Sequence, residues 1–91
     1  MTIEVRVPSM LRECTGGQSL FALEASTLAD AVTGLLEAYP LLRYHIYDER
    51  GVQRPHVLLY YNDENIAWLD SLDVTLREGD SLTVLQAVSG G

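Results

Sequence analysis

Apolar and polar side chains alternate along residues 2–7. The apolar positions are Ile3, Val5 and Val7, and the polar ones are Thr2, Glu4 and Arg6. This period of two is that of a strand with one buried face, and Pro8 ends the strand because proline has no N–H to donate. Ser9–Gln18 contains two adjacent glycines and is expected to be a loop. The loop leads into a second strand, Ser19–Leu23, which forms an antiparallel hairpin with the first.

The next apolar positions recur at helical spacing and predict one main helix. They are Leu28, Ala31, Val32, Leu35, Leu36 and Tyr39. Thr27 is a favourable N-cap, and Asp30 complements the positive end of the helix dipole. Pro40 marks the end of the helix. Leu41–Tyr47 is expected to add a short helical turn, followed by a polar turn at Asp48–Gly51.

The second half of the chain predicts further strands. Val57–Asn62 is rich in strand-forming residues, and Asn62–Asn65 is a turn into a short apolar segment with Ile66, Trp68 and Leu69. We expect this segment to be a short strand and Trp68 to be a core residue; an exposed binding role for Trp68 is the alternative. The last strand is expected over Ser81–Val88.

This order of elements predicts an α+β domain of the β-grasp (ubiquitin-like) class. One main helix would cross a mixed sheet of four to five strands. The first and last strands have the most similar apolar faces, so they are expected to be neighbours at the centre of the sheet. The whole chain, residues 1–91, then forms a single domain with a protruding, flexible tail at residues 88–91.

The alternation of side chains predicts an exposed apolar patch beside this tail. Leu82 and Val84 should face the core, which turns Leu85 outward. On the strand before it, Val57, Leu59 and Tyr61 are predicted to face inward. Leu58 and Tyr60 would then lie outward with Leu85 and form a surface for docking a partner protein. Alternatively, a loop covers the patch, or the register is shifted by one residue and the two faces exchange.

Composition restricts the partners. The net charge of −7 disfavours nucleic acid and anionic membranes, which would be repelled, and favours a protein with a basic face. No apolar run approaches the ~20 residues needed to span a bilayer. We expect a cytoplasmic protein that is a monomer when free.

Residues typical of catalysis or metal binding are sparse and scattered. Cys14 is the single cysteine and is expected to be an incidental loop thiol, and no cysteine or histidine pair has metal-ligand spacing. His45 and His56 stand in unrelated contexts, and the carboxylates of the turns are typical of solvated capping. The pattern therefore predicts no enzyme, no metal and no bound cofactor.

The end of the chain is the strongest functional signal. The apolar strand continues through Ala87, Val88 and Ser89 into Gly90 and Gly91. Glycines without side chains can enter a narrow channel, so we predict that the Gly91 carboxylate is the reactive group and that the four residues before it contact a partner. The chain contains no lysine, which excludes lysine-linked chains of this protein.

Three segments resemble the ThiS/MoaD sulfur-carrier superfamily, and within it the CysO-type carriers. They are Val7–Gly17, Tyr60–Asn65 and Glu78–Gly91, the last with its Gly-Gly terminus. The resemblance implies that an E1-like (MoeB/ThiF-type) adenylyltransferase joins Gly91 to AMP from ATP. A sulfur donor would then convert the acyl-adenylate into a thiocarboxylate that supplies a sulfur-accepting synthase in cysteine, cofactor or secondary-metabolite synthesis. The alternatives are a ubiquitin-like modifier, a molybdopterin synthase small subunit, and an interaction domain with a coincidental tail.

Overall fold

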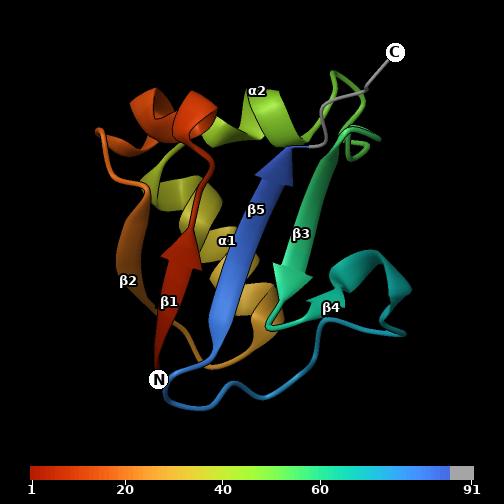
Figure 1. Cartoon of the computed structure of the whole chain (residues 1–91). Coiled ribbons are helices and arrows are strands. Elements are labelled where there is room, and N and C mark those ends of the chain that lie inside the picture. The colour runs from red at the N-terminus through yellow and green to blue at the C-terminus, as the bar shows by residue number, and fades with distance from the viewer. Residues whose placement is uncertain (87–91) are drawn as a thin grey trace.

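The computed structural model describes residues 1–86, which form a sheet backed by one main helix (Figure 1). The strands are β1 (Thr2–Arg6), β2 (Leu20–Glu24), β3 (Val57–Tyr61), β4 (Glu64–Asn65) and β5 (Ser81–Gln86). The helices are α1 (Leu28–Ala38) and α2 (Leu42–Ile46), with two 3-10 helices, η1 (Ser9–Thr15) and η2 (Ile66–Trp68).

The sheet has five strands in the order β2-β1-β5-β3-β4. β1 and β2 form the predicted antiparallel hairpin, and β1 pairs in parallel with β5, with Val5 opposite Leu82. β5 in turn pairs antiparallel with β3. The first and last strands are therefore central neighbours, and the predicted β-grasp arrangement with a mixed sheet is confirmed.

The core lies between α1 and the face of the sheet that it covers (Figure 1). Ile3 and Val5 of β1 and Leu82 and Val84 of β5 have almost no exposed surface, as the alternation predicted. The Thr27 hydroxyl caps α1 by accepting a hydrogen bond from the Asp30 N–H at 3.1 Å. The inward side chains of two central strands therefore meet one apolar helix face.

Two expectations about local structure are wrong. The short strand is Glu64–Asn65, not the apolar segment after it, because a two-residue turn with Asn62 at φ 54° returns the chain directly to β3. The apolar segment instead forms η2, where Ile66 is buried and Trp68 is 75% exposed. A single 3-10 turn points its side chains in different directions, and Ile66 takes the inward one. Trp68 is therefore not a core residue.

The predicted loop Ser9–Gln18 also contains more structure than expected, since η1 occupies Ser9–Thr15. Leu11 and Thr15 are its buried residues, and the Thr15 hydroxyl donates to the Gln18 carbonyl at 2.5 Å. Gly16 follows at φ 65°, a backbone conformation that favours glycine. The short helix predicted within Leu41–Tyr47 is confirmed as α2.

A polar network joins β3 to the turn that leads into β5. The Asp80 carboxylate accepts hydrogen bonds from the Tyr61 hydroxyl at 2.7 Å, the Arg77 N–H at 2.9 Å and the Asn62 amide at 3.3 Å. The Tyr61 hydroxyl is the largest of the causes that hold the pKa of Asp80 below its ordinary value, followed by the Arg77 N–H. The network fixes the point at which β5 begins.

Replacing Asp80 by asparagine is expected to lower the free energy of unfolding at pH 7 by about 1 kcal/mol, because charge-assisted hydrogen bonds are lost from a partly exposed site. The folded-state pKa is depressed, so the contribution of this carboxylate is present above its ordinary pKa of 3.8 and is lost as the pH falls through the folded value. Urea unfolding at pH 7 and at about pH 3 checks this. A difference between the proteins that grows on acidification would contradict it.

Candidate functional site

The end of β5 carries the chain toward the predicted reactive carboxylate. Gln86, its last residue, lies opposite Val57, the first residue of β3. β5 pairs with β1 over Ser81–Thr83 and with β3 from Leu82 as far as Gln86, so β3 alone pairs with the last three residues of the strand. The predicted site residues Ala87, Val88, Ser89, Gly90 and Gly91 lie outside the described residues.

The open face of the sheet, opposite α1, contains the predicted apolar patch. Leu85 is 42% exposed, and its cross-strand partner is Leu58. Tyr60 lies two residues further along β3, opposite Thr83, and both Leu58 and Tyr60 are half-buried. The structure thus brings the three predicted side chains to one face, and we call Leu58, Tyr60 and Leu85 the β3–β5 patch.

The inward half of the same prediction also agrees with the structure. Val57 and Leu59 are buried, and Tyr61 is half-buried against the core with its hydroxyl on Asp80. The register is therefore the predicted one. The half-burial of Leu58 and Tyr60 means that Leu85 contributes the most exposed part of the patch.

Arg54 and Tyr44, which the sequence did not indicate as site residues, lie near the end of the sheet where β5 ends and β3 begins. The Arg54 carbonyl accepts from the Val57 N–H at 3.1 Å, and its guanidinium donates from Nε to the Tyr44 carbonyl at 3.1 Å. Tyr44 on α2 is 70% exposed. The helical spacing of Leu42 and Ile46, which are buried, could have indicated that Tyr44 points outward.

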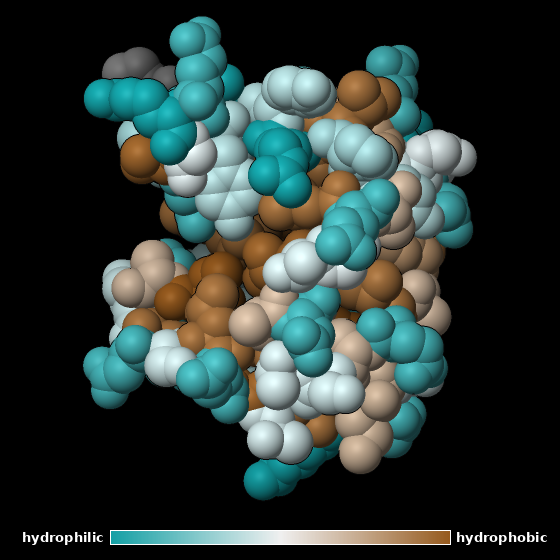
Figure 2. All heavy atoms as spheres, turned by 180° about the vertical axis from the view of Figure 1, so that it is seen from behind, coloured by the Kyte–Doolittle hydropathy of each residue, from teal (hydrophilic) through white to brown (hydrophobic). Residues whose placement is uncertain are grey.

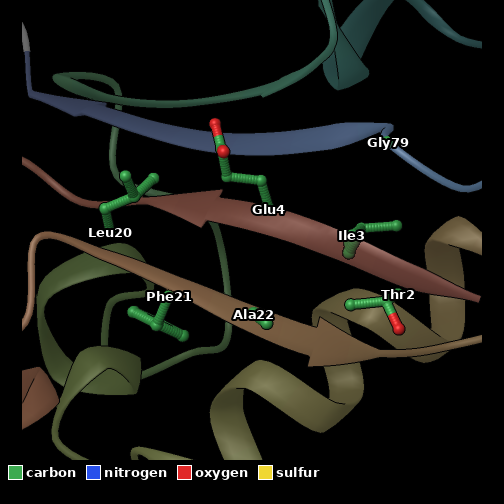
Figure 3. Close-up of a pocket in the computed structure, with 7 residues that line it drawn as sticks. All are labelled: Thr2, Ile3, Glu4, Leu20, Phe21, Ala22 and Gly79. Atoms are coloured by element: carbon green, nitrogen blue, oxygen red, sulfur yellow. The ribbon is translucent and has the colours of Figure 1, made fainter.

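The open face also has a hollow of about 350 Å³ over β1 and β2 (Figure 3). Its lining residues are Thr2, Ile3, Glu4, Leu20, Phe21, Ala22 and Gly79. Glu4 is the one ionisable side chain among them, and it pairs with Arg6 at 2.6 Å. A lone paired carboxylate supplies no acid–base or nucleophilic partner, so this hollow does not form a reactive centre.

The α1 side of the molecule has a second hollow of about 430 Å³. Its lining residues are Val32, Thr33, Leu36, Arg43, Tyr47, Asp48, Glu49 and Gly51. Figure 2 shows apolar side chains gathered on this side with polar groups around them. Asp48 lies at its rim, with its carboxylate accepting from the N–H groups of Arg50 and Val52 at 2.9 and 3.0 Å. These hydrogen bonds, of which the one from the Val52 N–H has the larger effect, hold the pKa of Asp48 below its ordinary value. The Asp48 carboxylate thus stabilises the turn.

The remaining reactive side chains do not assemble either. Burial, with a smaller contribution from the Glu13 carboxylate, raises the pKa of the Cys14 thiol and disfavours the nucleophilic thiolate. Within residues 1–86, histidine, cysteine and carboxylate side chains form no group that could hold a metal ion. None of the helices in this part of the chain has the length and apolar character needed to cross a bilayer.

The model of the ThiS family matches residues 5–91. The chain belongs to the ThiS family. Sulfur carrier protein CysO of Mycobacterium tuberculosis is 32% identical over 93 residues, with both chains fully covered. Small archaeal modifier protein 3 of Haloferax volcanii is 28% identical, also over the full length of both. The predicted family is thereby confirmed.

A solved structure has the same fold. The crystal structure of the Amycolatopsis orientalis BexX/CysO complex contains a chain that superposes with a TM-score of 0.78 at 26% identity, covering 98% of this chain and 99% of that one. The ThiS-family match reaches Gly91 and so includes the five residues that follow β5 in the sequence, with the terminal Gly-Gly.

Proposed function

We propose that this ThiS-family protein is a sulfur carrier that transports sulfur as a thiocarboxylate on Gly91. The single observation that carries the proposal is the full-length similarity to a protein named sulfur carrier protein CysO, together with the Gly-Gly sequence that follows β5. An E1-like (MoeB/ThiF-type) adenylyltransferase activates the carboxylate, and a sulfur-accepting synthase receives the sulfur. All of these steps take place in the cytoplasm, where ATP is available.

The chemistry explains why activation is needed. A Gly91 carboxylate oxygen attacks the α-phosphorus of ATP, pyrophosphate leaves, and the acyl-adenylate forms. Hydrosulfide from a sulfur donor then attacks the acyl carbon, the bond to AMP breaks, and the thiocarboxylate remains after loss of a proton. A carboxylate is a poor electrophile, whereas AMP is a good leaving group, and the thiocarboxylate sulfur is a good nucleophile.

The carrier itself contributes position, not catalysis. Its described residues supply a body with β5 at the centre of the sheet, and the reactive group is the Gly91 carboxylate. The β3–β5 patch lies on the same strand that leads to the tail. We propose that this patch docks on the partner enzyme while residues 87–91 reach its reaction centre.

A second candidate function is protein modification, which the similarity to small archaeal modifier protein 3 favours. Attachment of Gly91 to a lysine of another protein uses the same acyl-adenylate. The chain has no lysine of its own, so lysine-linked chains of this protein cannot form, and single attachment is the remaining form. Service as a molybdopterin synthase small subunit would use the same thiocarboxylate with a different acceptor.

Incubation of the protein with ATP, an active E1-like adenylyltransferase and sulfide is expected to raise its intact mass by about 16 Da, because sulfur replaces one oxygen of the activated acyl group. The control is the protein that lacks Gly91 and therefore ends at Gly90. Its intact mass should be unchanged by the same incubation. An unchanged mass of the full chain with an enzyme that adenylates another carrier would contradict the proposal. Cellular conjugates with a Gly-Gly remnant on lysines of other proteins would favour the modifier function.

A further inference from the structure

The outer side of β2 is an open edge of the sheet. β2 is the outermost strand on the β1 side (Figure 1). The Val7 N–H donates to the Ser19 carbonyl at 2.9 Å, and this register directs the backbone groups of the odd-numbered residues of β2 at β1. Leu20, Ala22 and Glu24 therefore direct their N–H and C=O groups away from the sheet. These groups have no hydrogen-bond partner within residues 1–86, and all three residues are exposed.

The other edge of the sheet is protected against pairing, whereas β2 is not. The edge strand on that side is β4, which has only two residues, and so short an edge offers little to pair with. β2 has five residues, pairs with β1 without a bulge, and contains neither lysine nor proline. Bulges, lysine and proline are the features with which proteins usually prevent edge pairing. β2 can therefore accept one more strand.

A second copy of β2 fits this edge in the antiparallel direction. If Ala22 lies opposite Ala22 of the second copy, all three residues with free backbone groups find partners, and about six hydrogen bonds form. The small alanine side chains meet at the two-fold axis. On the α1 side, Phe21 of each copy then lies opposite Leu23 of the other. Both residues are partly buried against the core, so the pairing covers the apolar surface that they still expose.

The charge distribution favours antiparallel pairing of two copies. Eight carboxylates and a single arginine lie at the end of the sheet where β5 begins: Glu24, Asp30, Asp63, Glu64, Asp70, Asp73, Glu78, Asp80 and Arg77. The other five carboxylates are balanced by five arginines. Antiparallel pairing places the acidic end of each copy beside the nearly neutral end of the other, whereas parallel pairing would bring the two acidic ends together. Glu24 then lies opposite Leu20 of the second copy and not opposite a like charge.

The charged groups beside β2 are already paired within the chain. The Glu24 carboxylate lies 3.7 Å from the N-terminal ammonium group of Met1, and the Glu4 carboxylate lies 2.6 Å from the Arg6 guanidinium. A strongly charged peptide therefore gains no free counter-charge at this edge. A second copy of β2 needs none, because its own Glu24 is paired in the same way.

We propose that two copies of this chain associate through β2 as a two-fold dimer with one continuous sheet. Composition led us to expect a monomer, and the open edge becomes evident only from the order of the strands. Two five-residue strands bury less surface than the about 1,200 Å² at which stable interfaces begin, so the dissociation constant should be roughly 10⁻⁴ M. β1 and β5 separate β2 from β3, so the dimer leaves the β3–β5 patch accessible and does not depend on the proposed function.

The test is sedimentation equilibrium of the full chain from about 10 µM to about 1 mM, a range that brackets this dissociation constant. The average mass should rise from that of a monomer toward twice that value. Ala22→Lys places like charges opposite each other at the two-fold axis and should weaken the dimer at least roughly 10-fold. Ala22→Pro removes an N–H that β1 does not use, so the chain should fold but remain monomeric. Ala67→Lys is the matched control, at an exposed alanine of η2 beyond the other edge, and should leave the dissociation constant within about twofold.

Cross-linking shows whether the two copies meet at Ala22. In a Cys14→Ser background, Ala22→Cys should form a disulfide-linked dimer on mild oxidation, because facing Cα atoms of a hydrogen-bonded antiparallel pair lie about 5.5 Å apart, a distance that a disulfide spans. Ala67→Cys in the same background should remain monomeric. Circular dichroism checks the folding of each variant.

Three results would each overturn the inference. They are a wild-type chain that stays monomeric up to about 1 mM, a folded Ala22→Pro or Ala22→Lys variant that dimerises like the wild type, and equal cross-linking at positions 22 and 67. The cross-linking comparison decides the question even if the lysine and proline variants do not fold. Adenylation enters none of these measurements, so their failure would leave the proposed function intact.

Discussion

Replacing Gly90 by valine is expected to reduce adenylation of Gly91 by at least about 100-fold, since misplacing a reacting group by about 1 Å costs this much, while the thermal unfolding midpoint stays within about 1 °C. A β-branched side chain next to the proposed reactive carboxylate restricts the backbone, and it widens a segment that the proposed function requires to enter a narrow channel of the enzyme. Glycine has no side chain, so the change removes no side-chain contact from the buried core, which in the described residues is built from positions 3–84. Pyrophosphate release and a calorimetric scan measure the two quantities.

Gly34→Ala is the matched glycine control for this experiment. Gly34 lies within α1, and an added Cβ would meet no heavy atom within 4 Å. Alanine there should stabilise the protein by about 0.5–1 kcal/mol, because it favours the helix over the unfolded chain, and adenylation should not change. If Gly90→Val lowered the unfolding midpoint substantially in addition to lowering adenylation, the glycine would be a structural residue. The role that we assign to it would then be wrong.

The second large effect concerns two neighbouring residues of β5. Leu85→Asp is expected to weaken binding to the adenylating enzyme by about 2 kcal/mol or more, roughly 30-fold, because a charge is placed at the centre of an apolar contact. The variant should remain folded, since Leu85 is 42% exposed on the open face. Binding by calorimetry and folding by circular dichroism check both parts.

Val84→Asp is the counterpart of this variant on the other face of the same strand. Val84 is 1% exposed, and an unpaired carboxylate in the core is expected to cost several kcal/mol and to unfold the domain. The same substitution at two adjacent residues is thus expected to abolish binding in one case, Leu85→Asp, and folding in the other, Val84→Asp. If Leu85→Asp unfolded the protein, or if Val84→Asp left it folded, the assignment of the two faces would be wrong.

The regular elements could be predicted from the sequence because their side-chain periods are long enough to be read. β1, β5 and α1 each repeat an apolar position over a full face, and Thr27 and Pro40 mark the helix ends. Tertiary contacts decided the rest. η1 forms within a segment whose apolar residues have no helical period. It is stabilised by the burial of Leu11 in the core and by the hydrogen bond that the Thr15 hydroxyl donates to the Arg12 carbonyl.

Some features of the candidate site could likewise be predicted from the sequence, and others could not. The outward direction of Leu85 follows from the alternation along β5, and its meeting with Leu58 follows from pairing of that strand with β3. The exposure of Trp68 could not be deduced, because a single apolar run is compatible with a strand or with a 3-10 turn. The Arg54–Tyr44 contact joins a loop to a helix end, and no local pattern encodes it.

The pairing of β1 with β5 also determines when the protein can fold. The hydrogen bond from the Thr2 N–H to Glu78 spans 76 positions, so the central strand pair closes a loop that includes almost the whole chain. Such long-range closure slows folding, and before β5 is synthesised both β1 and β3 have an open edge that invites aggregation. The sheet becomes complete only with the strand that precedes the glycines, so a chain interrupted before β5 cannot compete for the partner enzyme as a folded but unreactive decoy.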